Sequence, residues 1–593
     1  MVQDSQRPPA PDGRSQEPGP PQAGPVSLPR RGFILSSPGA VPERGPAVGP
    51  SATAISPAPP RSTSALELTA RLGGDGLLVA TALVSLVFSV IQWATPNLIG
   101  IDGYYHIRLA AILRDQGWRM VLPLDFPWLP TTILNPAEFT DAHLLYHLLL
   151  VPFSLLDLRL GAKLAAVIFA SLALLAAYQL MARHGVRYSL IWLMVLLASA
   201  WPSLFRLSMT RRQSLTLLLL LLALYLAFTQ RRRWLVPLGF AFIWLFDGFP
   251  LLLGVCGAAL IGNWWERRRP DWGLVLYPAL GIALGTVIHP YFPKNVIFSY
   301  LHVLPKILQL LGLGTGDVVI QVGIEWYPYS RDFLWEANWL ALVLVPVGFV
   351  PIVLDPRPSR LRALDGKVVT LAILAVVFLV MFLRARRWVE AEPTFATLFC
   401  AFAWNRAQPD RLAGRLAQLI PAGARPLAGL AAAAVVAPLL YLSVSATMSD
   451  VRSENNYVEY RDASLWLARN TPPGARVFPT DWDDFPELFF WNTHNVYLVG
   501  LDPTYMYLHD GPAYLRWRSI TRGQVERPSA AIRDEFDCGW VFTDREHRAF
   551  LRQAAADPDL VEMFRDGDTV VYAVKGWQPR QSRAAPANTT LNV

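Results

Sequence analysis

The sequence has few cysteines and few charged residues. Its three cysteines, Cys256, Cys400 and Cys538, lie far apart and form no CxxC pair, which argues against a disulfide framework and against a thiolate metal site. Only 17% of the 593 residues are charged, whereas 53% are hydrophobic, and the mean hydropathy is +0.30. Because soluble multidomain proteins do not have this composition, the sequence predicts a polytopic α-helical membrane protein.

Both ends of the sequence lack apolar periodicity. Residues 1–63 are rich in Pro, Gly, Ser, Ala and Arg and cannot bury enough surface to offset the entropy lost on ordering, so we predict a disordered N-terminal tail. Residues 579–593 are predicted to form a second disordered tail. The N-terminal tail also lacks the basic-then-apolar pattern of a cleaved signal peptide, so the first apolar run, 76–98, should act as an uncleaved anchor.

Apolar runs recur along residues 64–447, the predicted transmembrane domain. A helix needs ~20 residues to span the hydrocarbon, and the pattern gives about 11 crossings, or about 13 if two ambiguous helices at 140–157 and 296–313 are counted. Two of the runs, 251–264 and 392–405, are short enough to be tilted, broken or re-entrant. The runs after the first lie at 161–182, 188–205, 213–230, 233–250, 251–264, 272–289, 336–354, 367–385, 392–405 and 426–446.

Arginine clusters indicate the orientation of these helices, because positive residues are retained on the cytoplasmic side. If the first run crosses from inside to outside, the inner loops contain the clusters at 183–187, 231–233, 266–269, 356–367 and 406–415. The outer segments are then 99–160, 206–212, 290–335, 386–391 and everything after about 447. The formal charge of +8 is therefore explained by the orientation of the helices in the membrane. We predict a multi-pass protein of the plasma (inner) membrane that contacts membrane lipid, and we expect no nucleic-acid partner.

Residues 448–578 differ in character from the preceding runs. A helical run and a turn at 454–478 are followed by the short β-like runs CGWVFTD and DTVVYAV. We predict a small extracytoplasmic α/β domain.

The stretch GIDGYYHIRLA places charged and aromatic residues at the exit of the first apolar run. Asp102 could hold a divalent cation, and Arg108 could hold a pair of phosphate oxygens. The alternative is an interfacial belt, in which the tyrosines anchor at lipid headgroups and Asp102 caps the following helix.

A second polar set follows in the same outer loop. His143 and His147 are four residues apart and would share one face of a helix, and Asp141 precedes them. A carboxylate with imidazoles could ligate a metal, zinc or manganese more readily than magnesium. The alternative is a polar stripe on an interfacial helix.

Arginines also stand on the predicted outer side, where orientation rules disfavour them. RLSMTRRQ contains Arg211 and Arg212, and RARRWVE contains Arg386 and Arg387. Two cationic clusters suggest a phosphate-bearing lipid ligand, with snorkelling to membrane lipid as the alternative. Glu325, in a long outer loop, could be a metal ligand, a base or a surface acid.

The order of these motifs resembles the catalytic subunits of oligosaccharyltransferases, which are membrane glycosyltransferases of the C-type (GT-C) fold, and is most similar to the archaeal and bacterial single-subunit forms. The motifs are DGYYHIR at the first exit, RLSMTRRQS after two further runs, IEWYP in a late loop, RRWVE outside a later run, and PTDWDDF at the opening of the outer domain.

The resemblance implies transfer of a sugar or oligosaccharide from a polyprenyl-linked phosphate or diphosphate donor to an acceptor on the outer face. It implies that Asp102 binds a divalent cation such as Mg²⁺ or Mn²⁺, and that Glu325 helps to bind the metal and to activate the acceptor. It also implies that Arg386 or Arg387 contacts the donor phosphates. The proton acceptor of an inverting displacement would be Asp102 first and Glu325 second.

Two motifs depart from the family. In place of an acidic metal-binding pair the second outer loop has Arg211 and Arg212, so either these arginines neutralise the donor phosphates without a metal or other ligands complete the site. The metal set would then be Asp102, Asp141, His143 and Glu325.

The acceptor-reading signature WWDYG is matched only loosely, by Trp482 and Asp484, so the acceptor need not be an Asn-x-Ser/Thr peptide. We therefore expect a membrane glycosyltransferase, with a lipid-linked-sugar transporter or a non-catalytic, decayed homologue as alternatives.

Overall fold

The computed structural model describes residues 65–116, 122–305, 323–354, 364–406, 425–453 and 456–578. All of them belong to one compact unit, Ala65–Val593. The predicted tails, 1–63 and 579–593, lie outside the described residues, as do most of the predicted arginine loops at 356–367 and 406–415.

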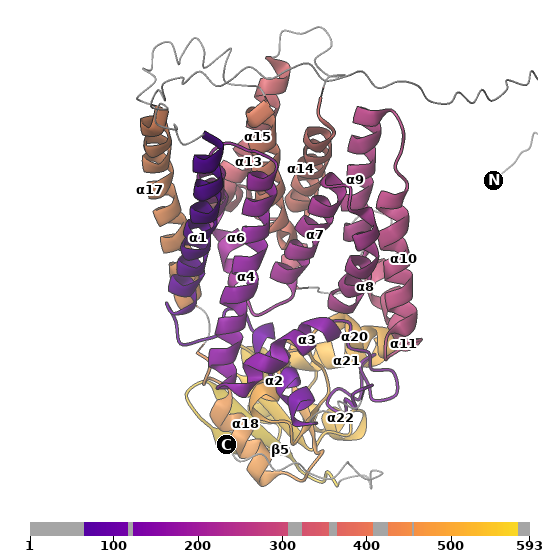
Figure 1. The fold of residues 1–593 in the computed structure, drawn as a ribbon. Coiled ribbons are helices and arrows are strands. Elements are labelled where there is room, and N and C mark those ends of the chain that lie inside the picture. Colours follow the sequence, from indigo (N-terminus) through magenta and orange to yellow (C-terminus); the bar gives the residue numbers. More distant parts are fainter. Residues whose placement is uncertain are drawn as a thin grey trace, which may run out of the picture. The chain divides into compact units, whose positions relative to one another are not determined.

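Each predicted apolar run forms a helix or a bent pair of helices, as expected where a segment must satisfy its backbone hydrogen bonds internally. The two short runs form the continuous helices α9 and α15. In chain order the helices of the bundle are α1 (Ala65–Gln92), α4 (Leu158–Arg183), α5 (Ser189–Ala198), α6 (Trp201–Ser208), α7 (Gln213–Phe228), α8 (Leu235–Leu245), α9 (Pro250–Arg267), α10 (Gly273–Ile288), α13 (Arg331–Val353), α14 (Gly366–Arg384), α15 (Ala391–Arg406) and α17 (Arg425–Arg452) (Figure 1).

The run predicted at 188–205 contains a sharp bend: it forms two helices, α5 and α6, whose axes differ by 89°. Pro202, in the first turn of α6, fits this new helix start because its missing N–H is not needed there. Of the described helices, 4 are long and apolar enough to cross a membrane, or up to 5 if the bent pair is one span. Several others, such as α7 and α10, are shorter apolar helices.

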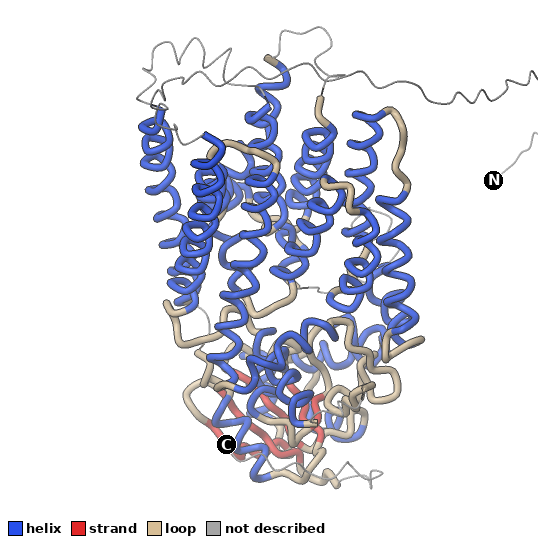
Figure 2. Tube along the Cα trace, viewed as in Figure 1, coloured by secondary structure: helices blue, strands red, loops and turns tan. Residues whose placement is uncertain are grey.

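The predicted outer segments gather at one end of the bundle. Figure 1 shows α2 (Asp102–Asp115), α3 (Leu144–Leu150) and α11 (Lys294–Phe298) at this end, and Figure 2 shows the strands there as well. The two ambiguous helices are short: α3 continues into η2 (Val151–Leu155), and α11 into η4 (Ser299–Val303).

The C-terminal part forms a five-stranded mixed sheet in the order β2-β1-β3-β5-β4. β1 pairs in parallel with β2 and β3, whereas β5 pairs antiparallel with β3 and β4. The strands are β1 (Arg476–Pro479), β2 (Val496–Tyr497), β3 (Trp540–Asp544), β4 (Leu560–Arg565) and β5 (Thr569–Val574). The helices between and before them are α18 (Arg461–Asn470), α19 (Phe485–Trp491), α20 (Pro503–His509), α21 (Gly511–Thr521), α22 (Pro528–Asp534) and α23 (Arg548–Ala556).

The first outer loop and the sheet domain share one hydrophobic core. Tyr105 and Phe126 pack against Phe485 and Phe489. The backbone N–H of Tyr497 donates to the carbonyl of Trp128 at 2.8 Å. This shared core fixes α2 between the helix bundle and the sheet.

Close helix packing in the bundle predicts an effect of a single methyl group. A Cβ on Gly262 of α9 would clash with the carbonyl oxygen of Gly366 and the hydroxyl of Thr370 on α14, whereas a Cβ on Gly257 meets nothing within 4 Å. Gly262→Ala should therefore lower stability by about 1–3 kcal/mol through overpacking, measured as a drop in the melting temperature of the purified protein in detergent. Gly257→Ala, the same change on the same helix, should leave the melting temperature unchanged or higher; equal effects of both variants would contradict this packing account.

Candidate functional site

A cavity of about 1020 Å³ lies where the bundle, the outer loops and the sheet domain meet. The segment at the start of α2, the turn before α7 and the residues after β1 all contribute to its wall. The predicted site residues that line it are Asp102, Asp141, His143, Arg211, Arg212, Glu325, Arg387 and Trp482.

Arg211 joins the two predicted catalytic carboxylates. Its Nη2 lies 2.7 Å from Oδ2 of Asp102, and its Nη1 lies 3.6 Å from Oε2 of Glu325. The turn that carries Arg211 can approach α2 because Gly103 has no side chain; a Cβ there would lie 3.1 Å from Cβ of Thr210. Asp102 stands in the first turn of α2, but no side chain caps this helix, so the carboxylate pairs with an arginine and does not act as an N-cap.

Glu325 is the centre of a cluster of three arginines, Arg206, Arg211 and Arg387, which we call the arginine cluster. Its Oε2 lies 3.0 Å from Nη1 of Arg206, and its Oε1 lies 3.5 Å from Nη1 of Arg387. The side chain is only 20% exposed, so Glu325 is not a surface acid. Burial raises the pKa of Glu325, but Arg387, Arg211 and Arg206 outweigh burial and hold the pKa well below its ordinary value.

The other predicted arginines lie in different surroundings. Arg212 lines the cavity with its guanidinium 4.6 Å from the ring centre of Phe246. Arg108 and Arg386 are not among the cavity's lining residues. The Nε of Arg108 donates to the carbonyl of Phe490 at 2.6 Å, which ties α2 to the sheet domain. The Nε of Arg386 donates to the carbonyl of Pro328 at 3.2 Å and so holds the loop that carries Glu325.

The predicted metal ligands do not fit a divalent cation. Among the described residues, no group of three or more His, Cys, Asp or Glu side chains is arranged to hold a metal ion. Asp102 and Glu325 are bridged by Arg211, whereas Asp141 lies 2.7 Å from Nδ1 of His147 through Oδ2 and accepts the backbone N–H of His143 through Oδ1. The set of four ligands, and with it the Mg²⁺ or Mn²⁺ expectation, is therefore not supported, because a guanidinium stands between two of the carboxylates.

The sheet domain supplies an acidic and aromatic wall. The carboxyl ends of parallel strands meet at one edge of a sheet, and Asp481, Trp482 and Asp483 follow β1 at that edge and line the cavity. Asp502, which follows β2, lines it as well. Asp484 is 4% exposed and is not among the cavity's lining residues. It accepts a hydrogen bond from the hydroxyl of Tyr460 at 3.1 Å. Asp484 therefore fixes the position of the segment that lines the cavity without lining it itself.

A histidine that follows β3 braces this wall. Nε2 of His547 lies 3.4 Å from Oδ2 of Asp481, and its Nδ1 lies 2.8 Å from Oδ1 of Asp544. Burial lowers the pKa of His547, but the two aspartates outweigh burial and raise the pKa to about 10. His547 is therefore cationic at neutral pH and holds Asp481 as a carboxylate.

The cavity continues into the bundle as an apolar groove. Gly254 and Gly257 of α9 line it, and a Cβ at either position would meet nothing within 4 Å. The remaining groove residues come from α9 and α14 and are Leu251, Val255, Ala258, Ile261, Ile373, Leu374, Val377, Phe378 and Met381. One compartment is therefore apolar and lies among helices of the bundle, while the other is charged and lies at the end of the bundle next to the sheet domain.

Besides Asp502, sequence reasoning missed four other polar residues of interest that the fold brings to the cavity. Arg206 belongs to the quoted arginine motif, and its contact with Glu325 could not be read from spacing. Asp481 and Asp483 flank Trp482. His106 lies four residues after Asp102, and this helical spacing was a signal that both face the same way.

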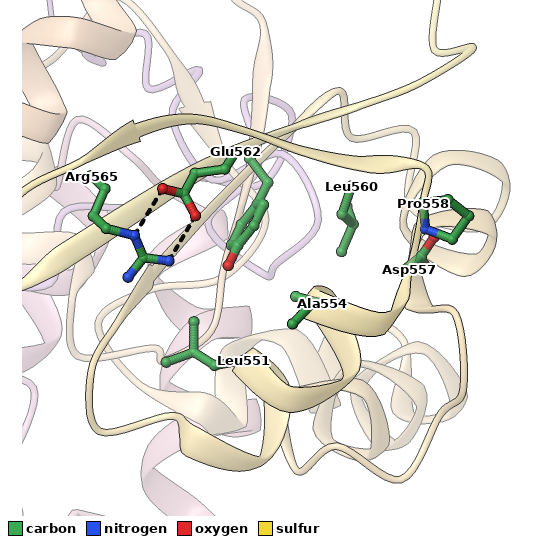
Figure 3. A pocket seen from close by; sticks show the side chains of 9 residues that line it. Leu551, Ala554, Asp557, Pro558, Leu560, Glu562 and Arg565 are labelled. Carbon is green, nitrogen blue, oxygen red and sulfur yellow. Dashed lines mark hydrogen bonds and ion pairs between the residues drawn. The ribbon is translucent and has the colours of Figure 1, made fainter.

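A separate pocket of about 470 Å³ lies on the sheet domain between α23 and β4 (Figure 3). Glu562 and Arg565 form a two-point ion pair there, at 2.8 and 2.7 Å. The side chain of Glu562 is 43% exposed and that of Arg565 is 49% exposed. No residue that lines this pocket belongs to the arginine cluster. The pair is therefore a solvent-exposed ion pair with which the buried ion pairs of Glu325 can be compared.

No protein-family model matches the chain, and no curated protein matches it. Solved structures do match. The apo crystal structure of the oligosaccharyltransferase of Archaeoglobus fulgidus aligns with a TM-score of 0.57 and 14% sequence identity, over 84% of this chain and 74% of that chain. The oligosaccharyltransferase AglB of the same organism, in complex with an inhibitory peptide and a dolichol-phosphate, aligns with a TM-score of 0.57 and 12% identity, over 86% and 75%.

The chain has the GT-C glycosyltransferase fold. This confirms the predicted fold class, a helical membrane domain followed by a small α/β domain. At this level of identity the match concerns the fold alone, and the reaction has to be argued from the cavity.

The arginine cluster predicts a defined dependence of stability on pH. Because the pKa of Glu325 is depressed on folding, its stabilising ion pairs are complete at and above its ordinary pKa and are lost only as the pH falls through the depressed value. Glu325→Gln should lower the free energy of unfolding by about 3 kcal/mol at pH 7, and by the same amount at pH 5. The measurement is thermal or denaturant unfolding in detergent at both pH values.

The matched control is Glu562→Gln, which removes an exposed ion pair with an arginine. It should cost less than about 1 kcal/mol. A difference between wild type and Glu325→Gln that shrinks between pH 7 and pH 5 would contradict the depressed pKa.

Proposed function

We propose that the protein is an inverting glycosyltransferase that uses a polyprenyl-phosphate or polyprenyl-diphosphate sugar as donor, on the extracytoplasmic face of the plasma membrane. The observation that carries the proposal is the continuity of the apolar groove between α9 and α14 with the arginine cluster at its outer end. A polyprenyl-linked sugar has the same order of parts: an apolar tail, an anionic phosphate and a polar sugar.

The arginine cluster suits a departing phosphate. Breaking the bond between sugar and phosphate leaves negative charge on a phosphate oxygen, and fixed guanidinium groups stabilise that charge. Nε of Arg211 is buried and has no hydrogen-bond partner in the structure, which leaves an N–H group for a ligand. Arg387 and Arg212 line the same part of the cavity and would contact further phosphate oxygens.

A fold neighbour supports a lipid phosphate as ligand. The AglB structure from Archaeoglobus fulgidus contains a dolichol-phosphate, and the groove described here offers the apolar and cationic surfaces that such a molecule needs.

The two carboxylates have different tasks in this proposal. Asp102 is the catalytic carboxylate that contacts the nucleophilic group of the acceptor, since it stands at the cavity wall beside the arginines. Glu325 holds Arg206, Arg211 and Arg387 together and so positions them for the phosphate. No step requires a metal ion, because the arginines supply the positive charge.

The acceptor is proposed to lie against the sheet-domain wall. Trp482 offers a flat apolar surface, and Asp481 and Asp483 offer hydrogen-bond acceptors. Asp484 contributes from behind by fixing the segment through Tyr460.

Turnover and its dependence on Asp102 test the reaction. Purified protein in detergent with phospholipid should release labelled sugar from a polyprenyl-phosphate sugar, and release should continue in the presence of EDTA. Asp102→Asn should lower the rate by at least about 100-fold, because the acceptor loses the contact that orients it, while the melting temperature shows that the protein is folded. Full turnover in this variant would remove Asp102 from the mechanism, and transbilayer movement of an intact donor would favour a transporter.

Donor binding tests the role of the arginine cluster. Arg387→Gln should weaken the binding of polyprenyl phosphate about tenfold or more, because a charge-assisted hydrogen bond contributes about 1.5–3 kcal/mol. Arg384→Gln, three residues earlier and exposed, should bind as wild type does. The measurement is a titration of the purified protein with polyprenyl phosphate; equal weakening by the two substitutions would point to a general charge effect.

A further inference from the structure

Three polar side chains of the first outer loop form a continuous line in the wall of the cavity. Oδ2 of Asp141 lies 2.7 Å from Nδ1 of His147, and Nε2 of His147 lies 2.7 Å from Nδ1 of His106. Asp141, His147 and His106 are 4%, 1% and 4% exposed. We call this line the Asp-His-His relay.

The ends of the relay fix the hydrogen positions within it. A carboxylate only accepts hydrogen bonds, so Nδ1 of His147 carries the hydrogen that faces Asp141. In the arrangement with one hydrogen on each imidazole ring, Nε2 of His147 is an acceptor and Nδ1 of His106 is the donor. Nε2 of His106 is therefore left with a lone pair, and this residue lines the cavity.

His106 lies beside the reacting groups of the proposed transfer. It follows Asp102 by four residues on α2, and residues at this spacing share one face of a helix. T-shaped ring contacts hold the relay from the side: Tyr146 packs against His106 at 5.2 Å, and Tyr105 packs against His147 at 5.8 Å between ring centres.

The carboxylates of the cavity are less suited to take up a proton. Both carboxylate oxygens of Glu325 are engaged by the arginine cluster, Oε2 by Arg206 and Arg211 and Oε1 by Arg387. One oxygen of Asp102 is engaged by Arg211.

His106 is neutral at physiological pH. Burial lowers its pKa most, and the neighbouring groups His147, His143, Arg212 and Arg211 lower it further. A neutral imidazole is the form that accepts a proton.

We propose that His106 is the general base of the transfer and that His147 and Asp141 position it. This inference rests on the proposed function and deepens it. As the acceptor's oxygen forms its bond to C1 of the sugar, the bond from C1 to the phosphate oxygen breaks and its electron pair stays on the phosphate. The hydroxyl proton of the acceptor moves to Nε2 of His106, and the relay spreads the resulting positive charge toward Asp141.

The relay indicates the chemical class of the acceptor. A hydroxyl group gains nucleophilicity when a neighbouring base removes its proton during attack. The acceptor is therefore an alcohol, supplied by a sugar or by a serine or threonine side chain, and water would react at the same place when no acceptor is present.

Hydrolysis of the donor by water tests the base without knowledge of the acceptor. The substrates are undecaprenyl phosphates that carry labelled hexoses or pentoses, and the readout is release of free sugar. His106→Ala should lower this rate about 100-fold but change the affinity for undecaprenyl phosphate less than threefold. Imidazole added to the variant should restore part of the rate, and substituted imidazoles of higher pKa should restore more.

His494→Gln is the matched control, since His494 is also partly buried and hydrogen-bonded but is not among the residues that line the cavity. Its rate should stay within threefold of wild type. A His106→Ala variant that retains full activity, or one that imidazole does not rescue, would overturn the assignment of the base. Failure of the wild-type protein to bind undecaprenyl phosphate would instead count against the proposed function.

The hydrogen positions provide a test that needs no turnover. In protein labelled with ¹⁵N-histidine, the nitrogen shifts of His106, assigned by comparison with His106→Gln, should show an unprotonated Nε2 and a protonated Nδ1 at pH 7. Asp141→Asn should change this pattern, because the carboxylate sets the hydrogen position on His147. A protonated Nε2 in the wild-type protein would overturn the proposal.

Discussion

The ion pairs of Arg211 and Glu325 hold the centre of the site together. Arg206 and Arg211 come from one segment and Arg387 from another, and the three would repel one another at this distance without the carboxylate between them. Arg211 extends the same connection to the start of α2 through Asp102. Cationic groups are thereby fixed at the end of the apolar groove next to the sheet domain, so a phosphate would meet an arranged set of donors and little reorganisation would be needed.

The position of α2 depends on packing on both sides. The aromatic core shared with the sheet domain holds one side, and the contact of Gly103 with Thr210 brings the other close to the turn before α7. The polar cluster at the exit of the first apolar run is therefore buried at an interface and does not form a belt at the lipid headgroups. This burial also keeps His106 and His147 away from bulk water.

Hydropathy was sufficient to predict the helices of the bundle, because the backbone of an apolar segment has few alternatives to a helix in lipid. Hydropathy could not show that a sharp bend lies between α5 and α6. A turn between two helices depends on the residues that pack around it more than on the length of the apolar run. Charge patterning selected Arg211, Arg212 and Arg387, which line the cavity, and equally Arg108, whose guanidinium meets a backbone carbonyl instead.

The same limit applies to the acidic and histidine residues. Sequence spacing paired His143 with His147, whereas the fold pairs His147 with Asp141 and with His106 of a different helix. The family resemblance pointed to Trp482 and Asp484. Trp482 does line the cavity, but the neighbouring acids that line it are Asp481 and Asp483, and Asp484 does not. The contact between His106 and His147 joins residues 41 positions apart, and no local pattern records it.

The order of the walls along the chain has a consequence for biosynthesis. The groove and the arginine cluster are complete once the ribosome has passed Arg387, but Asp481, Trp482 and Asp483 come later, after the last helix of the bundle. The side of the cavity that is proposed to bind lipid phosphate is thus made first, and the opposite wall is added only when the sheet has paired β1 with β3. A growing chain could hold a lipid donor before it has a surface on which to receive an acceptor.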